Sequence, residues 1–224
     1  MSTSVVWFRQ DLRLHDNPAL NAALQSGDAV IPLFIWCPEE ESPWAPASAT
    51  QWWLHHSLQS LSDSLKDLGS RLLIRSGSCL ETLWEVARAT GADSVYWNRR
   101  YEPKAISRDK EIKTKLRDDG FTVESFNAQL LFEPWTISTQ KDEPYQVFTP
   151  FSKACLNANR PDDPLSEPEK MKAPKKWIKS ESLKSLELLP KKWKAQFGDF
   201  WTPGEQGARK RWDDFRSSLD DYAE

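Results

Sequence analysis

The sequence predicts an α/β protein: a doubly wound, Rossmann-like sheet of five parallel strands with helices on both faces, followed by a long linker and a C-terminal helix. Short apolar runs are typical of strands buried on both faces, and they lie at 4–8, 29–36, 71–75, 94–98 and 121–126. Amphipathic stretches of helical period separate these runs. Connections of that length exclude hairpins, so the strands should pair in parallel through right-handed crossovers.

The first two helices are predicted from their caps and apolar stripes. Asn17 offers an N-cap oxygen and Pro18 has no N–H to satisfy in a first turn, so a helix should begin at 18. Ser48 and Gln51 have the spacing of a capping box. The helix after them carries one stripe of leucines and ends at Gly69. The stripe contains Leu54, Leu58, Leu61, Leu65 and Leu68.

The middle of the chain continues the alternation of strands and helices. Ser78 and Glu81 form a second capping box before a helix, and another helix is expected from 104 to 119. Pro32 lies inside the second apolar run, where it removes one backbone donor. We therefore expect that strand to be short or bulged at Pro32.

Three segments are expected along the chain: an α/β domain over 1–135, an interdomain segment and linker over 136–201, and the first helix of a further domain over 202–224. Positions 160–190 are rich in Pro, Lys, Glu and Ser, which predicts a long linker or a surface-wrapping loop. The last helix should have Thr202 as N-cap and Pro203 at its first position. Its apolar stripe, which must bury against something, contains Ala208, Trp212, Phe215, Leu219 and Tyr222.

Composition excludes several classes of protein. The net charge of −3 argues against a polyanion-binding surface over the whole molecule, although a local basic patch would fit. Cys37, Cys79 and Cys155 are odd in number and lack CxxC spacing, so neither a disulfide framework nor a zinc site is predicted. They are interpreted as small buried residues of a reducing compartment. Because no apolar run approaches 18 residues and no signal peptide begins the chain, a cytoplasmic protein without membrane contact is expected.

Common catalytic and nucleotide motifs are missing. The chain has no GxGxxG, no P-loop pattern and no GxSxG elbow. His55 and His56 are neighbours on a helix and point about 100° apart, and no HExxH spacing accompanies them. We therefore predict no metal site and no catalytic residue within these 224 positions.

Charged side chains gather where predicted strands end. The loop from Arg9 to Asp16 has two interpretations: ion pairs that close it on itself, or a polar cleft for a ligand. Cys37 follows the second strand and Glu102 the fourth, and both positions border the crevice of an open α/β sheet. For Glu102 the alternative is an ion pair with a neighbouring arginine, Arg99 or Arg100.

Five stretches identify a resemblance to a known family. They are VVWFRQDLRLHDNPAL at 5–20, QWWLHHSL at 51–58, YWNRRYEP at 96–103, YQVFTPFSKAC at 145–155 and the final helix at 204–222. Together they resemble the N-terminal, antenna-binding α/β domain of the DNA photolyase and cryptochrome family, closest to class I-type cyclobutane pyrimidine dimer photolyases. Members of that family continue into a helical flavin domain, which we do not expect within these 224 positions.

The resemblance implies a set of antenna contacts. In relatives, the counterpart of Glu102 hydrogen-bonds a pterin-type antenna, and the segment after the second strand packs on deazaflavin-type antennas. Glu102 is therefore the first expected contact, with weaker ones at Trp36, Cys37, Arg9, Tyr101 and Gln51. Relatives often have arginine where this chain has Gln51, and an amide cannot pair bidentately with an anionic tail. The chromophore type, methenyltetrahydrofolate or 8-hydroxy-deazaflavin, therefore stays open.

The resemblance also implies what the whole protein does. The antenna would pass excitation to reduced FAD, which donates an electron to a pyrimidine dimer in damaged DNA. FAD is expected only with the flavin-binding C-terminal domain, so this chain alone should be inactive in repair. Tyr222 is assigned to flavin binding and Lys153 to DNA phosphates, against the alternative of an ordinary surface lysine.

Two other functions stay open: a cryptochrome-type blue-light receptor, and a free-standing small-molecule or nucleotide-binding domain. We expect a monomer that can self-associate through an exposed last helix.

Overall fold

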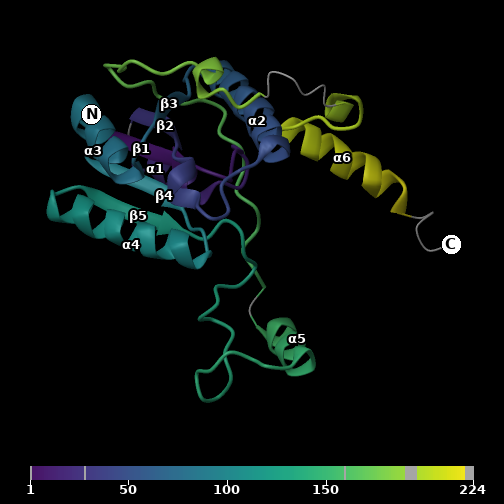
Figure 1. Ribbon diagram of the computed structural model, residues 1–224. Coiled ribbons are helices and arrows are strands. Elements are labelled where there is room, and N and C mark those ends of the chain that lie inside the picture. The colour runs from purple at the N-terminus through teal and green to yellow at the C-terminus, as the bar shows by residue number, and fades with distance from the viewer. Residues whose placement is uncertain (1, 28, 159, 190–195, 220–224) are drawn as a thin grey trace.

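The predicted fold class is confirmed by the computed structural model, which describes residues 2–27, 29–158, 160–189 and 196–219. Its centre is an all-parallel, five-stranded sheet in the order β3-β2-β1-β4-β5 (Figure 1). The strands are β1 (Thr3–Phe8), β2 (Ala29–Trp36), β3 (Leu73–Ser76), β4 (Ser94–Asn98) and β5 (Thr122–Phe126). The predicted boundaries of β2 and β4 agree with these, and those of the other three strands differ by at most two residues at either end.

Helices cover both faces of the sheet. The helices are α1 (Pro18–Gln25), α2 (Ser48–Asp67), α3 (Cys79–Thr90), α4 (Pro103–Asp118), α5 (Phe148–Asn157) and α6 (Glu205–Ser217). Successive strand residues alternate between two cores, since Val5 and Trp7 pack with α3 and α4, whereas Val6 and Phe8 pack with α1 and α2. The predicted leucine stripe of α2 faces the second core.

The expected bulge at Pro32 is wrong. β2 runs through Pro32 without interruption, and Pro32 pairs in register with Val6 of β1. The N–H of Val30 donates away from β1, to the carbonyl of Lys172, so the nitrogen of Pro32 two residues on points the same way. β3 begins pairing only at Leu33. The N–H that Pro32 lacks would therefore point to a position where no hydrogen bond between strands is needed.

Helix caps follow the sequence at two sites and depart from it at two. The Asn17 side chain accepts from the N–H of Leu20, and Ser78 caps α3, as predicted. The capping box at Ser48 is wrong, because Ala47 is the N-cap of α2 and Ser48 is already helical. Thr202 is likewise not the cap of α6: that helix begins at Glu205, after Gly204.

The segment after α5 wraps around the domain. Of the two predicted alternatives for positions 160–190, a long linker or a surface-wrapping loop, the structure therefore supports the second. Met171, Leu186 and Leu188 are buried beneath α2 and β3, so this segment contributes to the core despite its polar composition. Backbone bonds fix it along its course, including Met171 N–H to Leu68 O at 3.2 Å and Glu181 N–H to Ile74 O at 2.9 Å. Figure 1 shows it passing along the edge of the sheet that β3 forms.

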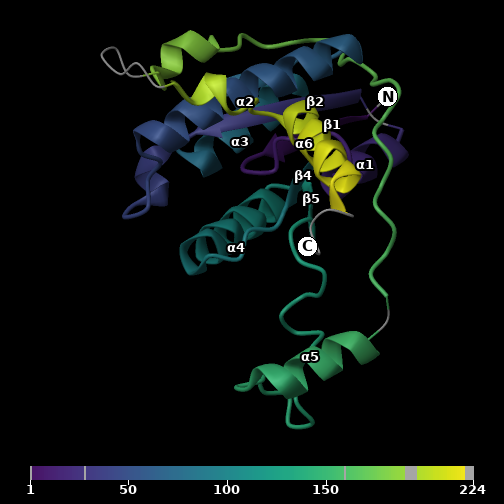
Figure 2. The same ribbon diagram turned by 90° about the vertical axis from the view of Figure 1, so that its right-hand side faces the viewer.

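Two helices stand apart from the sheet. α5 lies at the end of an extended arm, well away from the strands in both views (Figures 1 and 2). α6 touches α2 near its start and then extends outward. Its described apolar residues remain uncovered, with Trp212 58% and Phe215 42% exposed. Tyr222, the last residue of the predicted stripe, lies outside the described residues.

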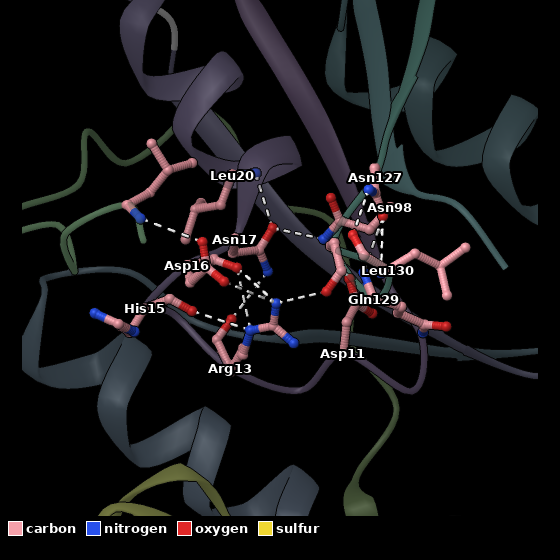
Figure 3. A network of polar contacts seen from close by, with 12 residues as sticks. Asp11, Arg13, His15, Asp16, Asn17, Leu20, Asn98, Asn127, Gln129 and Leu130 are labelled. Carbon is pink, nitrogen blue, oxygen red and sulfur yellow. Dashed lines mark hydrogen bonds and ion pairs between the residues drawn. The ribbon is translucent and has the colours of Figure 1, made fainter. Parts of the chain in front are cut away.

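A buried polar cluster joins the carboxyl ends of the central strands. The side-chain amide of Asn98, at the end of β4, donates to Asp11 Oδ2 at 2.6 Å and to Asn17 Oδ1 at 2.8 Å. Its oxygen accepts the N–H of Ala19 in α1 at 3.0 Å. One side chain thereby connects β4, the loop after β1 and the start of α1, as Figure 3 shows.

Replacement of Asn98 tests this cluster. Asn98→Ala leaves a buried carboxylate oxygen of Asp11 and the N–H of Ala19 without partners, so we expect a loss of about 2–4 kcal/mol in the free energy of unfolding. Urea denaturation followed by circular dichroism measures it. The matched control, Asn157→Ala on exposed α5, should change stability by less than about 0.5 kcal/mol. Equal effects of the two variants would contradict the assigned role.

Candidate functional site

A pocket of about 730 Å³ opens at the carboxyl ends of β1, β2 and β4. The short helix η1 (Pro38–Glu41), the loop after it and the first turns of α2 form the opposite wall. This is the edge at which an open parallel sheet offers a crevice to ligands, and the volume is that of a small-molecule site. Four residues of the predicted antenna set line it: Arg9, Trp36, Cys37 and Glu102.

Aromatic side chains provide the apolar part of the lining. Trp7, only 2% exposed, contributes its ring at the end of β1, and Phe34 and Trp36 contribute theirs from β2. Trp44, on the loop after η1, is 88% exposed. A flat aromatic ligand therefore has rings to pack against in the pocket and at its rim.

Three polar atoms of the pocket lining are buried and make no hydrogen bond to any described residue. They are Trp7 Nε1, Arg9 Nε and Glu40 Oε2. Buried polar groups normally have partners, because leaving one unpaired costs about 1–3 kcal/mol. Two donors and one acceptor without a hydrogen bond thus belong to residues that line the same cavity, each atom closed off from solvent just behind its surface.

Arg9 is held rigidly at this wall. Its Nη1 donates to Asp109 Oδ2 of α4 at 2.6 Å, and its Nη2 donates to the carbonyl oxygen of Asn98. The guanidinium carbon also lies 4.7 Å from the centre of the Trp7 ring. These contacts use the terminal nitrogens and fix the orientation of Nε.

Glu41 joins two arginines across the pocket. Its Oε1 accepts from Arg100 Nη1 at 2.7 Å and from Arg108 Nη1 at 3.0 Å. Burial alone would raise the pKa of Glu41, but the hydrogen bonds and charges of the two arginines outweigh burial and lower that pKa below its ordinary value. The loop after β2 is thereby tied to the segment after β4 and to α4.

Glu102 lines the pocket and is also ion-paired. Its carboxylate accepts from Arg100 Nη2 at 3.0 Å and from Arg100 Nε at 3.3 Å, and its side chain is 53% exposed. The hydrogen bond from Arg100 lowers the pKa of Glu102. The two interpretations of Glu102 therefore coexist: it is paired with a neighbouring arginine and still faces the cavity.

Two residues of the predicted antenna set lie outside the pocket. The Tyr101 hydroxyl turns toward the end of β5, where it donates to Glu133 Oε2 at 2.9 Å. Burial and this carboxylate raise the pKa of Tyr101 to about 12. The Gln51 amide turns back to the carbonyl of Pro46, at 2.9 Å. Local hydrogen bonds thus direct both side chains away from the cavity.

Lys153 does not line this pocket. It is exposed on α5, a helix that lies far from the sheet in both views (Figures 1 and 2). Tyr222 lies outside the described residues. The assignments of Lys153 to DNA and of Tyr222 to flavin stay predictions.

The loop from Arg9 to Asp16 is mainly structural. Arg13 donates to the carbonyls of His15, Asp16 and Ala128 (Figure 3). The Asp16 carboxylate accepts the N–H of Leu165 from the wrapping segment at 3.2 Å. The loop therefore closes on itself and on its neighbours, as the first interpretation held, while Arg9 alone of its charged residues lines the pocket.

Sequence reasoning missed a contact between two cysteines. Cys37 Sγ and Cys79 Sγ are 2.6 Å apart, and a carboxylate oxygen of Glu40 lies within 4.8 Å of both. Within the described ranges, this is the one group of His, Cys, Asp or Glu ligand atoms compact enough to hold a metal ion. Its members are up to 42 positions apart, so no short spacing motif signals it. The available signal was that each cysteine comes shortly after a strand, Cys37 after β2 and Cys79 after β3, and that these two strands are adjacent in the sheet.

The model of the DNA photolyase family matches residues 4–173, about three quarters of the chain. The chain belongs to the DNA photolyase family. It carries the N-terminal α/β domain of photolyases and cryptochromes, as the five sequence stretches indicated. No helix of the described residues is both long and apolar enough to cross a bilayer.

Relatives cover the photolyase domain almost completely. A deoxyribodipyrimidine photo-lyase of Agrobacterium fabrum is 49% identical over 94% of this chain, which matches 44% of that protein. Cryptochrome-2 of Arabidopsis thaliana is 40% identical over 98% of this chain and 37% of its own length. The chain therefore spans less than half the length of these relatives.

A solved structure agrees in fold. The crystal structure of a bacterial class III photolyase from Agrobacterium tumefaciens superimposes with a TM-score of 0.89 at 47% identity, over 96% of this chain and 44% of that one. This relative is a class III enzyme, whereas the sequence resemblance pointed to class I-type enzymes.

The Glu41 bridge predicts a pH-dependent stability. Because the folded-state pKa of Glu41 is depressed, its contribution is complete above the ordinary pKa of 4.5 and is lost as pH falls through the folded value. Glu41→Gln should therefore lower the unfolding free energy at pH 7, and the gap to the unsubstituted protein should shrink below about pH 4.5. Urea titrations at several pH values measure the gap. Glu111→Gln, at an exposed carboxylate, is the control; a gap for Glu41→Gln that is constant with pH would contradict the bridge.

Proposed function

We propose that the pocket at the strand ends binds a planar antenna chromophore, and that the domain is the light-harvesting part of a DNA photolyase. The observation that carries this proposal is the aromatic cavity at the strand ends, whose lining residues include three buried atoms without a hydrogen bond, Trp7 Nε1, Arg9 Nε and Glu40 Oε2. A ligand in the cavity would reach these atoms through a small shift of the side chains that carry them. A heterocycle with ring acceptors and an amino or ring N–H donor complements two donors and one carboxylate oxygen.

A methenyltetrahydrofolate-type pterin fits this pattern best. Its ring carbonyl and nitrogens are acceptors for Trp7 and Arg9, and its exocyclic amino group is a donor for Glu40. Trp36 and Trp44 supply aromatic surface, and Glu102 and Arg100 offer a charged pair on the same wall. An 8-hydroxy-deazaflavin lacks the exocyclic amino group, so it would use the carboxylate of Glu40 less fully.

Gln51 and Tyr101 have no part in this proposal as direct contacts. Both side chains are engaged elsewhere, with Pro46 and with Glu133. The arginines of the pocket wall, Arg9, Arg100 and Arg108, are each ion-paired with a carboxylate. They orient donors at the wall but do not replace the unpaired positive charge that an arginine at position 51 would add in relatives.

The remainder of the function is proposed for a chain that also carries a flavin-binding domain. When bound there, FAD supplies the electron that reverses a pyrimidine dimer in damaged DNA. The exposed Trp212 and Phe215 on α6 are proposed to pack against a flavin-binding C-terminal domain, and Lys153 on α5 to lie near the DNA phosphates. This chain should show no repair activity alone, and a cytoplasmic location stays a prediction.

A second candidate is a cryptochrome-type blue-light receptor. The 40% identity to cryptochrome-2 of Arabidopsis thaliana over nearly the whole chain supports it. The identity to the Agrobacterium fabrum photo-lyase, 49%, is higher and favours photolyase. Light-dependent reversal of pyrimidine dimers by the protein joined to its flavin domain separates the two candidates.

Chromophore binding is tested by removing one unpaired donor. Trp7→Phe keeps an aromatic ring but deletes Nε1, so we expect it to weaken binding of 5,10-methenyltetrahydrofolate by about 2–10-fold, the effect of one hydrogen bond. Equilibrium dialysis, read by the near-ultraviolet absorption of the folate, measures the dissociation constant.

Trp53→Phe is the matched control, because Trp53 lies on the outer side of α2 and does not line the pocket. Circular dichroism of each variant checks that the domain is folded. No saturable binding to the unsubstituted chain, or equal effects of the two substitutions, would contradict the proposed site.

A further inference from the structure

The geometry points to a reversible disulfide between Cys37 and Cys79, a redox couple at the wall of the pocket. The two Sγ atoms are 2.6 Å apart, and both residues are free thiols in this structure. A disulfide bond measures about 2.03–2.05 Å, so the sulfurs need to approach by only about half an ångström. The inference concerns these two sulfurs and does not depend on which ligand the pocket binds.

The fold brings the two cysteines together. Cys37 comes directly after β2, and Cys79 is the first residue of α3, which follows β3. β2 and β3 are neighbours in the sheet, with Trp36 opposite Ser76, so both cysteines emerge at the same edge. Cys79 has no exposed surface and Cys37 is 8% exposed. Two strands and a helix thus fix the positions of the two cysteines, so the folded chain holds their sulfurs close together.

The two thiols have different environments. Cys37 lines the pocket and is the sulfur that a small reagent can reach, whereas Cys79 lies in the core beneath it. The hydrogen bond with Cys37, followed by burial, raises the pKa of the Cys79 thiol. Access from the pocket assigns Cys37 as the attacking thiol and Cys79, which has no exposed surface, as the resolving one.

The chemistry is thiol–disulfide exchange with a small disulfide such as oxidised glutathione. The Cys37 thiolate attacks one glutathione sulfur, forms a mixed disulfide and releases one glutathione thiolate. Cys79 then loses its proton and attacks the Cys37 sulfur, so the intramolecular S–S bond forms as the second glutathione thiolate leaves. Two protein thiols are oxidised to one disulfide, one glutathione disulfide is reduced to two thiols, and the two protons pass to the released thiolates.

Glu40 is placed to assist the second step. Its Oε1 accepts the N–H of Cys79 at 2.9 Å, which holds the carboxylate beside the sulfurs. Its Oε2 is buried and has no hydrogen bond to the described residues, and Arg108 Nη1 lies 4.0 Å from it. One oxygen of this carboxylate lies within 4.8 Å of both sulfurs, which makes Glu40 the nearby acceptor for the Cys79 proton.

Oxidation would close a loop over the segment that forms the pocket. The residues between Cys37 and Cys79 include η1, α2 and β3. A cross-link of this span restricts the unfolded chain and should raise the melting temperature of the oxidised protein. It would also join the loop after β2 directly to α3. A reducing cytosol would keep both cysteines as thiols, and oxidative conditions would form the disulfide.

The test maps the cysteines of the unsubstituted chain. The protein is equilibrated with reduced and oxidised glutathione at a series of ratios, in the presence of a chelator so that no metal ion blocks the thiols. Remaining thiols are trapped by alkylation under denaturing conditions, and peptides are identified by mass spectrometry. We expect a Cys37–Cys79 linked peptide pair that grows with oxidised glutathione, an alkylated Cys155, and full reversal by dithiothreitol.

Variants and stability provide the controls. Cys155→Ser should leave the redox titration unchanged, whereas Cys37→Ser should abolish the linked pair and the rise in melting temperature on oxidation. The pair is read in the unsubstituted chain, so a variant that fails to fold does not remove the test. Alkylation of both Cys37 and Cys79 at every ratio, separate glutathione adducts on each, or a bridge to Cys155 would overturn the proposal.

Discussion

One buried amide, that of Asn98, holds the functional edge of this domain together. Parallel strands end with backbone and side-chain polar groups that must find partners once they are buried. Asn98 satisfies the Asp11 carboxylate, the Asn17 cap and the N–H of Ala19 at once. The loop from Arg9 to Asp16, fixed in this way, also binds a distant part of the chain. The carboxylate of Glu205 in α6 accepts hydrogen bonds from the N–H groups of Leu14 and His15.

The same constraint shapes the pocket. The carbonyl of Asn98 and the carboxylate of Asp109 accept hydrogen bonds from the terminal nitrogens of Arg9, and its Nε remains without a hydrogen bond just behind the cavity wall. A site built in this way has its donors oriented before a ligand arrives, which lowers the cost of binding. The rigidity comes from residues behind the wall, and the specificity comes from the few atoms left without partners.

The sequence predicted what depends on local pattern. Apolar runs, the leucine stripe of α2 and the Asn17 cap are short-range signals, and the structure confirms each of them. The sequence could not predict features that depend on contacts with residues far along the chain. The proline in β2 is tolerated because its nitrogen faces a position before the β3 ladder begins. Gln51 is drawn away from the pocket by a single backbone carbonyl, and Cys37 meets Cys79 only because β2 and β3 are adjacent.

The most direct measurement of the central claim is a crystal structure of this chain with 5,10-methenyltetrahydrofolate bound. The account predicts the pterin ring in the pocket at the ends of β1, β2 and β4, with acceptor atoms in hydrogen-bond distance of Trp7 Nε1 and Arg9 Nε and its amino group on Glu40. A chromophore bound elsewhere, or one in the pocket that leaves all three atoms without a partner, would contradict it.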